Sequence, residues 1–395
     1  MPKYQEKLSI IIPTKNRQKY AARCVETILQ KLPEGYEIIV QDNSDDKSLE
    51  SMLGDLIDGV KVKYAYESTC LSFCDNFERG LLMSSGDYAI MIGDDDCVLP
   101  GIIELTAIIR KKGIESVKFP TCHSYYWPNA VKDGNGLLVI RDQIPYLKTL
   151  TTKGALEQMA EFGDYDYQKY NFPKIYHGIV KRECLDKIRE KTGRCFGGLT
   201  PDIYSAVALS FYIEKMLYVN TPFTLPGVCA TSGTADSLTG RHTGELKDAP
   251  HFRGHVDYKW EESVPYVYSV NTIWAETAIK AVKENGGNIS LNNDEYFNFL
   301  VCILSVCPGF EERLVAYYAE LTKGDPKKIA KRMRSATKRR RNYYKRKRII
   351  NFALQIFKGR HTYNDVSDIE AALDIISNKK NTLEKTFKLI NKLEW

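Results

Sequence analysis

Between Leu8 and Ile92, four short apolar segments alternate with three amphipathic segments, and this order limits the fold more than any other feature of the chain. The apolar segments are rich in β-branched residues, as buried strands are, and the segments between them carry apolar residues at helical spacing. A β-α-β-α-β-α-β order predicts an α/β fold with a mostly parallel, doubly wound sheet. The expected strands are Leu8–Pro13, Tyr36–Val40, Val60–Tyr66 and Tyr88–Ile92, and the expected helices are Tyr20–Lys31, Ser48–Ile57 and Ser72–Ser84.

Polar clusters follow three of these four strands. The chain reads Pro13-Thr14-Lys15-Asn16-Arg17 after the first strand, Asp42-Asn43-Ser44 after the second, and Gly93-Asp94-Asp95-Asp96 after the fourth. Ligands of open α/β sheets bind at the carboxyl ends of the strands. We therefore expect a binding site at this edge of the sheet.

The acid triplet Asp94-Asp95-Asp96 is the sharpest local feature. Adjacent carboxylates repel one another and raise each other's pKa, and a divalent cation relieves that cost. Oxygen ligands alone suit Mg²⁺ or Mn²⁺, which take their remaining ligands from substrate phosphates. The triplet therefore predicts a Mn²⁺ or Mg²⁺ site, with a solvated acidic turn as the alternative.

Three motifs together resemble the opening of family 2 glycosyltransferases of the GT-A fold. They are Ser9-Ile10-Ile11-Ile12-Pro13-Thr14-Lys15-Asn16-Arg17, Glu37-Ile38-Ile39-Val40-Gln41-Asp42-Asn43-Ser44, and Gly86-Asp87-Tyr88 followed by Gly93-Asp94-Asp95-Asp96. The resemblance is strong over residues 8–104 and continues weakly to residue 235. It implies an inverting, metal-dependent transfer of a sugar from a nucleotide diphosphate donor, with a UDP-sugar as the first expectation.

The resemblance also implies roles for particular residues. The first loop would line the nucleotide, Asp42 would accept a hydrogen bond from the base or ribose, and the helix before the acidic strand would flank the base and pyrophosphate. Asp42 as a turn residue and Arg79 as an exposed helix charge are the alternatives. The expected nucleotide-binding residues are Pro13, Thr14, Asn16, Arg17, Asp42, Asp75, Asn76, Arg79, Asp94 and Asp95.

Two alignments of the family's Asp-x-Asp motif give two different sets of expected metal ligands. Asp94 and Asp96 have the motif's spacing, whereas alignment back from Leu99-Pro100 places Asp95 and Asp96 at its last two acids. We expect Asp96 to bind the metal directly and Asp94 or Asp95 to contact ribose or metal. His242 is the expected histidine ligand, ahead of His251 and His255.

The acceptor hydroxyl needs a general base. By the resemblance, Asp202 in Gly197-Gly198-Leu199-Thr200-Pro201-Asp202 takes that role, although it could also be a helix cap. Many relatives have Glu-Asp where this chain has Pro201-Asp202. Asp164 and Asp166 are weaker rivals.

A strongly basic segment lies at 326–350, with thirteen Lys or Arg and no acid. Subtracting these thirteen charges from the formal net charge of +6 leaves −7 for the rest of the chain. Apolar residues interleave with the cations and continue to 357, which suits a helix on an anionic membrane surface. A nucleic-acid patch, judged unlikely, and a solvated helix without a partner are the alternatives.

The expected domains are a GT-A catalytic domain over 1–250 and a mainly helical C-terminal domain over 251–395. The chain shows no signal-peptide pattern, and its ten scattered cysteines suit reduced thiols, so we expect a cytoplasmic protein, with a peripheral position at the inner face of the cytoplasmic membrane. The expected function is glycosyl transfer to a glycan or lipid-linked glycan acceptor in surface polysaccharide biosynthesis. A nucleotidyltransferase and a non-catalytic nucleic-acid-binding protein are the alternatives.

Overall fold

The computed structural model describes residues 4–130, 134–231, 243–357, 359–377 and 381–395. Its centre is an eight-stranded mixed sheet in the order β3-β2-β1-β4-β10-β6-β11-β9. The four N-terminal strands are mutually parallel, whereas β10 runs antiparallel to both β4 and β6. The strands are β1 (Gln5–Thr14), β2 (Tyr36–Asp42), β3 (Val62–Tyr66), β4 (Gly86–Met91), β6 (Ser116–Lys118), β9 (Leu147–Thr151), β10 (Gly178–Lys181) and β11 (Lys215–Val219).

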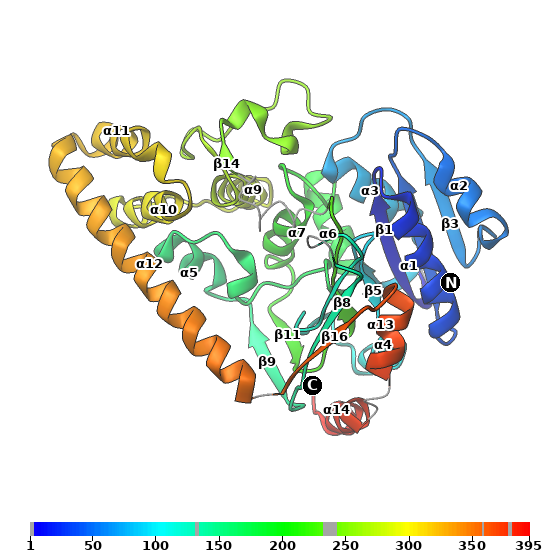
Figure 1. Ribbon diagram of the computed structural model, residues 1–395. Helices are drawn as coiled ribbons and strands as arrows, with labels where there is room; N and C mark the ends of the chain where they lie inside the picture. Colours follow the sequence, from blue (N-terminus) through cyan, green and yellow to red (C-terminus); the bar gives the residue numbers. More distant parts are fainter. Residues whose placement is uncertain (1–3, 131–133, 232–242, 358, 378–380) are drawn as a thin grey trace.

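The two faces of this sheet are covered by different helices, as Figure 1 shows. Strand β1 is buried on both faces, with Ile11 in one hydrophobic core and Ile10 and Ile12 in the other. This explains its continuous apolar run. The Ile10 side holds α1 (Gln18–Lys31), α2 (Ser48–Leu53) and α4 (Gly101–Lys112), and the Ile11 side holds α3 (Phe73–Met83), α5 (Ala155–Phe162), α6 (Arg182–Thr192), α7 (Pro201–Leu209) and α9 (Val270–Glu284).

Three helices extend the Ile11 side into a helical layer. They are α10 (Asn293–Val306), α11 (Glu311–Thr322) and α12 (Pro326–Phe357). Helix α12 contains the basic segment and runs along one edge of the molecule (Figure 1). Its first half packs through Ile329 and Met333, while residues 345–351 are exposed.

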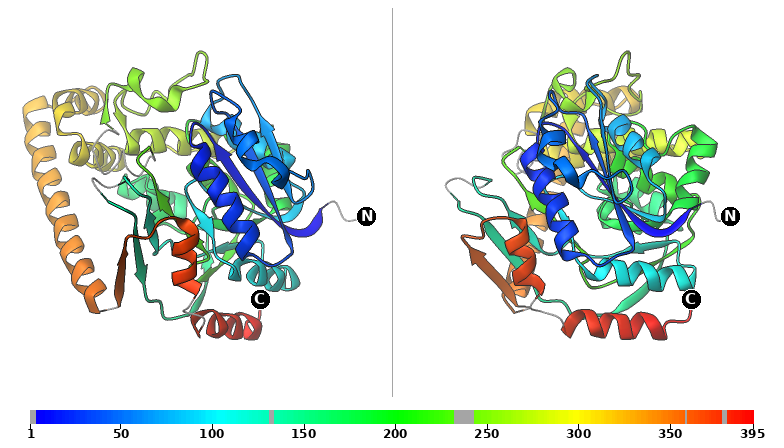
Figure 2. Two further views of the ribbon diagram at one scale, coloured as in Figure 1. Left: turned by 45° about the vertical axis from the view of Figure 1, so that its right-hand side comes forward. Right: turned by 90° about the vertical axis from the view of Figure 1, so that its right-hand side faces the viewer.

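After α12 the chain returns to the N-terminal part. Strand β16 (Arg360–Asn364) pairs antiparallel with β8 (Leu137–Arg141) and completes a small sheet in the order β13-β7-β8-β16. Helix α13 (Ile369–Ser377) lies beside α1, where Arg23 pairs with Asp368 at 2.8 Å (Figure 2). The remaining elements are β5 (Cys97–Val98), β7 (Ser124–Tyr126), β12 (Thr224–Leu225), β13 (Gly227–Val228), β14 (Thr243–Gly244), β15 (Tyr268–Ser269) and α14 (Asn381–Lys392).

The prediction of an α/β fold with a parallel-rich sheet is confirmed. The division at residue 250 stays a prediction, but β16, α13 and α14 lie against the N-terminal part rather than in the helical layer. The expected mainly helical region over 251–395 also contains two strands, β15 and β16, that the sequence patterns did not predict. Strand β16 was hidden because it alternates exposed and half-buried residues and lacks the apolar run of a central strand.

Candidate active site

The acid triplet lies where β1 and β4 end side by side, and its first member is neutralised by the loop after β1. Thr14 Oγ1 donates to Asp94 Oδ2 at 2.5 Å. The Arg17 guanidinium donates to the same oxygen at 3.1 Å and lies 2.9 Å from Asp94 Oδ1. Asp94 is fully buried, so its charge depends on these partners. The structure thus brings together three predicted residues of the site.

Asp95 has fewer partners than its two neighbours. Its Oδ2 accepts a hydrogen bond from the Cys229 backbone N–H at 3.1 Å, and its Oδ1 lies 3.6 Å from Arg17 Nη1. Burial, followed by the charge of Asp96, raises the pKa of the Asp95 carboxyl to about 7. Asp95 is therefore the carboxylate of the triplet that would gain most from a further cation.

Asp96 is held by four protein donors. Its Oδ2 accepts from the Gly93 N–H at 2.6 Å, from His177 Nε2 at 3.0 Å and from Tyr176 Oη at 3.3 Å, and its Oδ1 accepts from the Gly227 N–H at 2.7 Å. Burial tends to raise the Asp96 pKa, but these partners outweigh it and hold the pKa below its ordinary value. Asp96 thus anchors the loop that follows β4. Its predicted role as a direct metal ligand stays a prediction, and these hydrogen bonds do not favour it.

We expect Gly227→Ala to disrupt this anchor. A Cβ at Gly227 would lie 1.7 Å from the Asp95 backbone oxygen, which accepts from Trp127 Nε1 at 2.9 Å. Relief of such a clash must move β13 or the triplet, at a cost of about 1–3 kcal/mol or more in the free energy of unfolding. Urea unfolding measures this loss. Gly309→Ala, where a Cβ meets nothing within 4 Å, is the control, and equal stability of the two variants would contradict the prediction.

The loops after β1 and β2 are joined by hydrogen bonds. Asn16 has a positive φ of 56°, and its side chain donates to Asp45 at 2.9 Å and accepts from the Asp45 N–H at 2.9 Å. Asp42 is fully buried, and its two oxygens accept from the Ser44 N–H and from Tyr64 Oη, each at 2.9 Å. Pro13 lies opposite Gln41 in the β1–β2 register. Thr14, which bonds Asp94, lies opposite Asp42 in the same register, so the two loops lie at the sheet edge that carries the triplet. The contacts of Pro13, Asn16 and Asp42 to a nucleotide stay predictions.

The residues predicted on α3 separate into two groups. Asn76 lies under the site, where its Nδ2 donates to the Thr14 carbonyl at 3.2 Å and its Oδ1 is buried without a hydrogen bond. Asp75 bonds the Ser72 cap and Arg194, and Arg79 pairs with Glu67 near the surface. Asn76 therefore touches the β1 loop directly, whereas the ion pairs of Asp75 and Arg79 hold surrounding loops.

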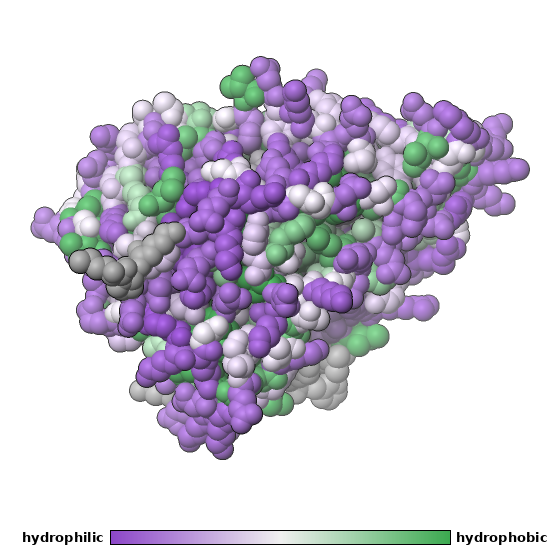
Figure 3. Space-filling model, turned by 180° about the vertical axis from the view of Figure 1, so that it is seen from behind, coloured by the Kyte–Doolittle hydropathy of each residue, from purple (hydrophilic) through white to green (hydrophobic). Residues whose placement is uncertain are grey.

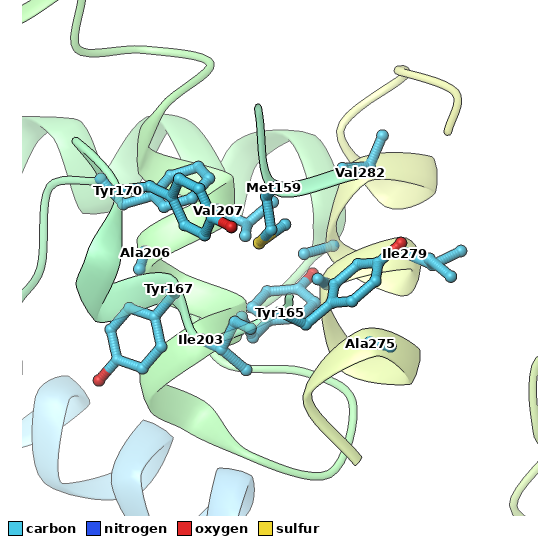
Figure 4. Close-up of a cluster of buried hydrophobic side chains, with 14 of the residues drawn as sticks. Met159, Tyr165, Tyr167, Tyr170, Ile203, Ala206, Val207, Ala275, Ile279 and Val282 are labelled. Atoms are coloured by element: carbon cyan, nitrogen blue, oxygen red, sulfur yellow. The ribbon is translucent and has the colours of Figure 1, made fainter. Parts of the chain in front are cut away.

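Asp202 lies at the start of α7, as the second residue of the helix. Its Oδ2 accepts from Tyr167 Oη at 3.1 Å, and burial raises its pKa. The hydroxyl of Tyr167 points away from the other labelled cluster residues in Figure 4. Tyr176, which bonds Asp96, also has its pKa raised by burial, then by the charges of Asp96, Asp95 and Asp202. The charge of Asp202 therefore acts on the same tyrosine as the charges of the triplet.

The rival bases have structural partners. Asp164 accepts from Lys169 at 2.7 Å, from Arg340 at 2.9 Å and from Tyr344 at 3.1 Å, which makes it the centre of an ion-pair cluster with α12. Asp166 caps the short 3₁₀ helix η2 (Tyr167–Lys169) through the Gln168 N–H. These contacts do not favour Asp164 or Asp166 as the general base.

Of the histidines predicted for the metal, His242 lies outside the described residues. His251 stacks on Phe73 and Tyr268, and His255 stacks on Tyr258. In the described ranges no three His, Cys, Asp or Glu residues are grouped to hold a metal ion. A metal ion at this site would therefore take its ligands from the triplet and from oxygens of the substrate.

Sequence reasoning missed Tyr176, His177 and Gly227, which hold Asp96. His177 also bonds Thr224 Oγ1 at 3.0 Å through its other ring nitrogen, which fixes the ring. The positive φ of His177, 51°, places it in a turn just before β10. No motif marks these residues, because their contacts join segments that are 80 or more positions apart.

Comparison with known families gives one decisive match. Residues 9–114, from β1 through α4 with the whole acid triplet, match the family described as Glycosyl transferase family 2. The chain carries a family 2 glycosyltransferase domain. The predicted family and the prediction of a glycosyltransferase enzyme are thereby confirmed.

Two curated relatives of this family 2 domain are glycosyltransferases. The chain is 24% identical over 219 residues to glycosyltransferase GlyG of Streptococcus pneumoniae, a match that spans 54% of this chain and 68% of the relative. It is 24% identical over 221 residues to the GalNAc(5)-diNAcBac-PP-undecaprenol beta-1,3-glucosyltransferase of Campylobacter jejuni, over 55% of this chain and 64% of the relative.

Solved structures of glycosyltransferases are also similar. TarS 1-349 of S. aureus in complex with UDP-GlcNAc has a TM-score of 0.44 at 11% identity, over 85% of this chain and 92% of that chain. Mannosyltransferase PcManGT of Pyrobaculum calidifontis in complex with GDP-Man and Mn²⁺ has a TM-score of 0.39 at 11% identity, over 85% and 86%. Separately, no helix in the described part of the chain is long and apolar enough to cross a membrane.

Proposed function

We propose that this chain is a metal-dependent, inverting glycosyltransferase that uses a UDP-sugar. Three groups support the proposal: the Asp94 carboxylate, which Thr14 and Arg17 hold where β1 and β4 end, the buried Asp42, which lies opposite Thr14 in the strand register, and Asp202 at the start of α7. In the proposal, a nucleotide at the strand ends directs its sugar toward Asp202. The three groups would then supply a leaving-group site, a nucleoside site and a general base.

The residues present fit a divalent cation. Asp95 and Asp94 would hold it, because both are buried carboxylates and the nearest charged partner of Asp95 Oδ1 in the described part of the chain is Arg17 at 3.6 Å. Mg²⁺ and Mn²⁺ commonly use one or two carboxylates and take the remaining ligands from phosphates and water. When bound, the cation would offset the charge that develops on the leaving diphosphate.

Asp202 acts in this proposal as the general base. The acceptor hydroxyl attacks the anomeric carbon from the face opposite the diphosphate, and the hydroxyl proton passes to a carboxylate oxygen of Asp202. Burial raises the Asp202 pKa, which strengthens it as a base, while Tyr167 fixes one of its oxygens. Arg17 and Thr14 donate hydrogen bonds to Asp94. When a donor binds, they can donate to its phosphate oxygens instead of to Asp94.

A screen of nucleotide-sugar hydrolysis tests this function. The purified chain is incubated with UDP-, GDP- and CDP-sugars, with Mn²⁺ or Mg²⁺ and with a chelator. We expect release of nucleoside diphosphate from a UDP-sugar only when metal is present. Turnover that is unchanged by the chelator would contradict the metal dependence. Turnover of GDP-sugars alone would contradict UDP as the nucleotide of the donor.

The acceptor in this proposal is a glycan or a lipid-linked glycan, and the enzyme works in surface polysaccharide biosynthesis at an anionic membrane surface. The Campylobacter relative is named as a glucosyltransferase for an undecaprenol-linked glycan, which supports a lipid-linked acceptor. The face of the molecule in Figure 3 is mostly hydrophilic with small apolar patches, which fits electrostatic rather than inserted membrane contact.

The free end of α12 is the proposed contact. Arg340 and Arg341, in the middle of the helix, are already engaged by Asp164 and by backbone carbonyls of α10. By contrast, Lys345, Arg346, Lys347 and Arg348 are exposed beside Ile349 and Ile350, which are 61% and 58% exposed. Within the described ranges none of these four cations forms an ion pair, so this part of the helix combines positive charge with apolar groups that can enter a headgroup layer.

We expect neutralisation of Lys345, Arg346, Lys347 and Arg348 to glutamine to weaken binding to anionic vesicles at least tenfold. Each cation near an anionic surface contributes on the order of 1 kcal/mol, and the contribution fades beyond a Debye length of ~8 Å. Vesicle co-sedimentation at two salt concentrations measures the effect.

The control variant replaces four exposed lysines on other elements, Lys148, Lys153, Lys187 and Lys191, by glutamine. Equal loss in both variants would mean that only net charge matters. Binding of the wild-type chain to oligonucleotides but not to vesicles would favour a nucleic-acid partner.

A further inference from the structure

The base loop, residues 197–200, leads the chain into α7, the helix that carries Asp202 as its second residue. Gly198 has a positive φ of 63°, and a Cβ at this position would lie 2.8 Å from Thr277 Cγ2 of α9. A Cβ at Gly197 would lie 2.5 Å from the Tyr204 ring of α7. The backbone of the base loop is therefore packed against α7 and α9 at distances that leave no room for a side chain.

Two side chains from other helices hold the base loop by hydrogen bonds. Thr277 Oγ1 accepts from the Leu199 N–H at 3.1 Å, and Cys74 Sγ of α3 donates to the Gly197 carbonyl at 3.1 Å. Thr277, Leu199 and Cys74 are all fully buried. Removal of the Thr277 hydroxyl would therefore leave the Leu199 N–H without its acceptor unless the base loop moves.

A buried carboxylate sets the direction of the Thr277 hydroxyl. Thr277 Oγ1 donates to Glu276 Oε2 at 3.4 Å, and Glu276 is fully buried. The other oxygen of Glu276 accepts from Tyr258 Oη, which fixes the carboxylate. With its proton turned toward Glu276, the hydroxyl presents its lone pairs to the Leu199 N–H.

Helix α3 joins the base loop to the donor side of the site. Cys74 contacts the Gly197 carbonyl, and Asn76 of the same helix donates to the Thr14 carbonyl at 3.2 Å. One helix therefore contacts both the loop that precedes Asp202 and the loop that follows β1. The distance between these two loops depends on how firmly each of them is held.

We propose that Thr277 is a positioning residue, which acts through the Leu199 N–H to place the Asp202 carboxylate for proton transfer. The inference rests on the proposed role of Asp202 as the general base. Leu199 immediately precedes Thr200, the N-cap of α7, so a shift of the Leu199 backbone moves the start of that helix. A base must lie within hydrogen-bond reach of the proton that it accepts, and a displacement of about 1 Å can lower a rate ~10²-fold.

Turnover of two Thr277 variants tests this role, with the UDP-sugar that gives the fastest UDP release in the hydrolysis screen and with Mn²⁺. Thr277→Val keeps the shape of the side chain but removes the hydroxyl, so we expect kcat to fall at least tenfold. The KM for the donor should stay within about twofold, because the hydrogen bonds of Thr277 go to Leu199 and Glu276. Thr277→Ser keeps the hydroxyl and should have a kcat within about threefold of the wild type.

Thr272→Val on the same helix is the matched control. Thr272 is fully buried and forms the capping box with Ser269 at the start of α9, so its substitution should lower Tm as Thr277→Val does. We expect the kcat of Thr272→Val to equal that of the wild type. An equal fall of kcat in Thr272→Val and Thr277→Val would show that lost stability alone slows turnover, and it would overturn the inference.

Hydrogen exchange of the Leu199 amide gives a readout that needs no substrate. We expect this amide to exchange at least tenfold faster in Thr277→Val than in the wild type and in Thr277→Ser, because the N–H loses its acceptor. Unchanged exchange in Thr277→Val would show that Thr277 does not hold the base loop, and it would overturn the inference.

The double variant Asp202→Asn with Thr277→Val separates this inference from the proposed function. If Thr277 acts through Asp202, the double variant should turn over as Asp202→Asn does, because the base whose position is disturbed is already absent. A further loss in the double variant, or wild-type turnover by Thr277→Val while Asp202→Asn is inactive, would overturn only the positioning role. Wild-type turnover by Asp202→Asn would overturn the base itself, and with it the positioning role.

Discussion

Asp202→Asn is expected to retain UDP-sugar binding and to lose transfer. The substitution keeps the size of the side chain and its hydrogen bond from Tyr167, but it removes the basic carboxylate. A positioned general base contributes ~10²–10⁴-fold to the rate, so kcat should fall by this factor. Calorimetry with the UDP-sugar and a transfer assay on the same preparation separate binding from chemistry.

Asp166→Asn is the matched control, because asparagine also caps the start of η2 and so keeps the local structure. We expect it to transfer sugar at nearly the wild-type rate. A rate of Asp202→Asn within about threefold of the wild type would show that another residue accepts the proton. If Asp166→Asn were the slower variant, the rival base would be favoured.

The second large effect concerns the metal. We expect Asp95→Asn to bind UDP equally with and without a chelator, whereas the wild type should lose about 10- to 100-fold in affinity when metal is removed. The reason is that Asp95 has the fewest protein partners of the triplet, while Asp96 is held by four donors.

Asp96→Asn tests whether Asp96, which both alignments of the motif include, binds the metal directly. In our interpretation it lowers Tm, because the His177 pair and two backbone donors lose their anion, and it leaves the metal dependence of UDP binding in place. Loss of metal dependence in a stable Asp96→Asn protein, with Asp95→Asn unaffected, would instead make Asp96 the ligand.

The strands at the centre of the sheet could be predicted to within a few residues. They are buried on both faces, so β1 and β4 appear in the sequence as uninterrupted apolar runs that end at polar clusters. The hydrogen bonds of Thr14 and Arg17 with Asp94 follow from the same logic, because neighbouring parallel strands end at one edge. Which acids bind a nucleotide or metal stays a prediction.

The partners of the triplet could not be predicted in this way. The Gly227 and Cys229 N–H groups reach Asp96 and Asp95 from 131 and 134 positions away, and backbone donors carry no residue signature. The sequence also could not show which cations of α12 form internal ion pairs and which lie on the surface. Its cations are spread over residues 327–348, and only the position of Asp164 shows that Arg340 is an internal ion-pair partner rather than a surface charge.

The return of β16 to β8 sets the order in which this enzyme can mature during synthesis. His361 follows its partner Asp142 by 219 positions, so at 5–20 residues per second a ribosome makes β16 roughly 10–45 seconds after β8. Until then the edge of β8 has no strand partner and is open to pairing with other chains. The small sheet beside the catalytic core can therefore close only after β16 has been made, and a nascent chain held by a chaperone until that moment would be protected from aggregation.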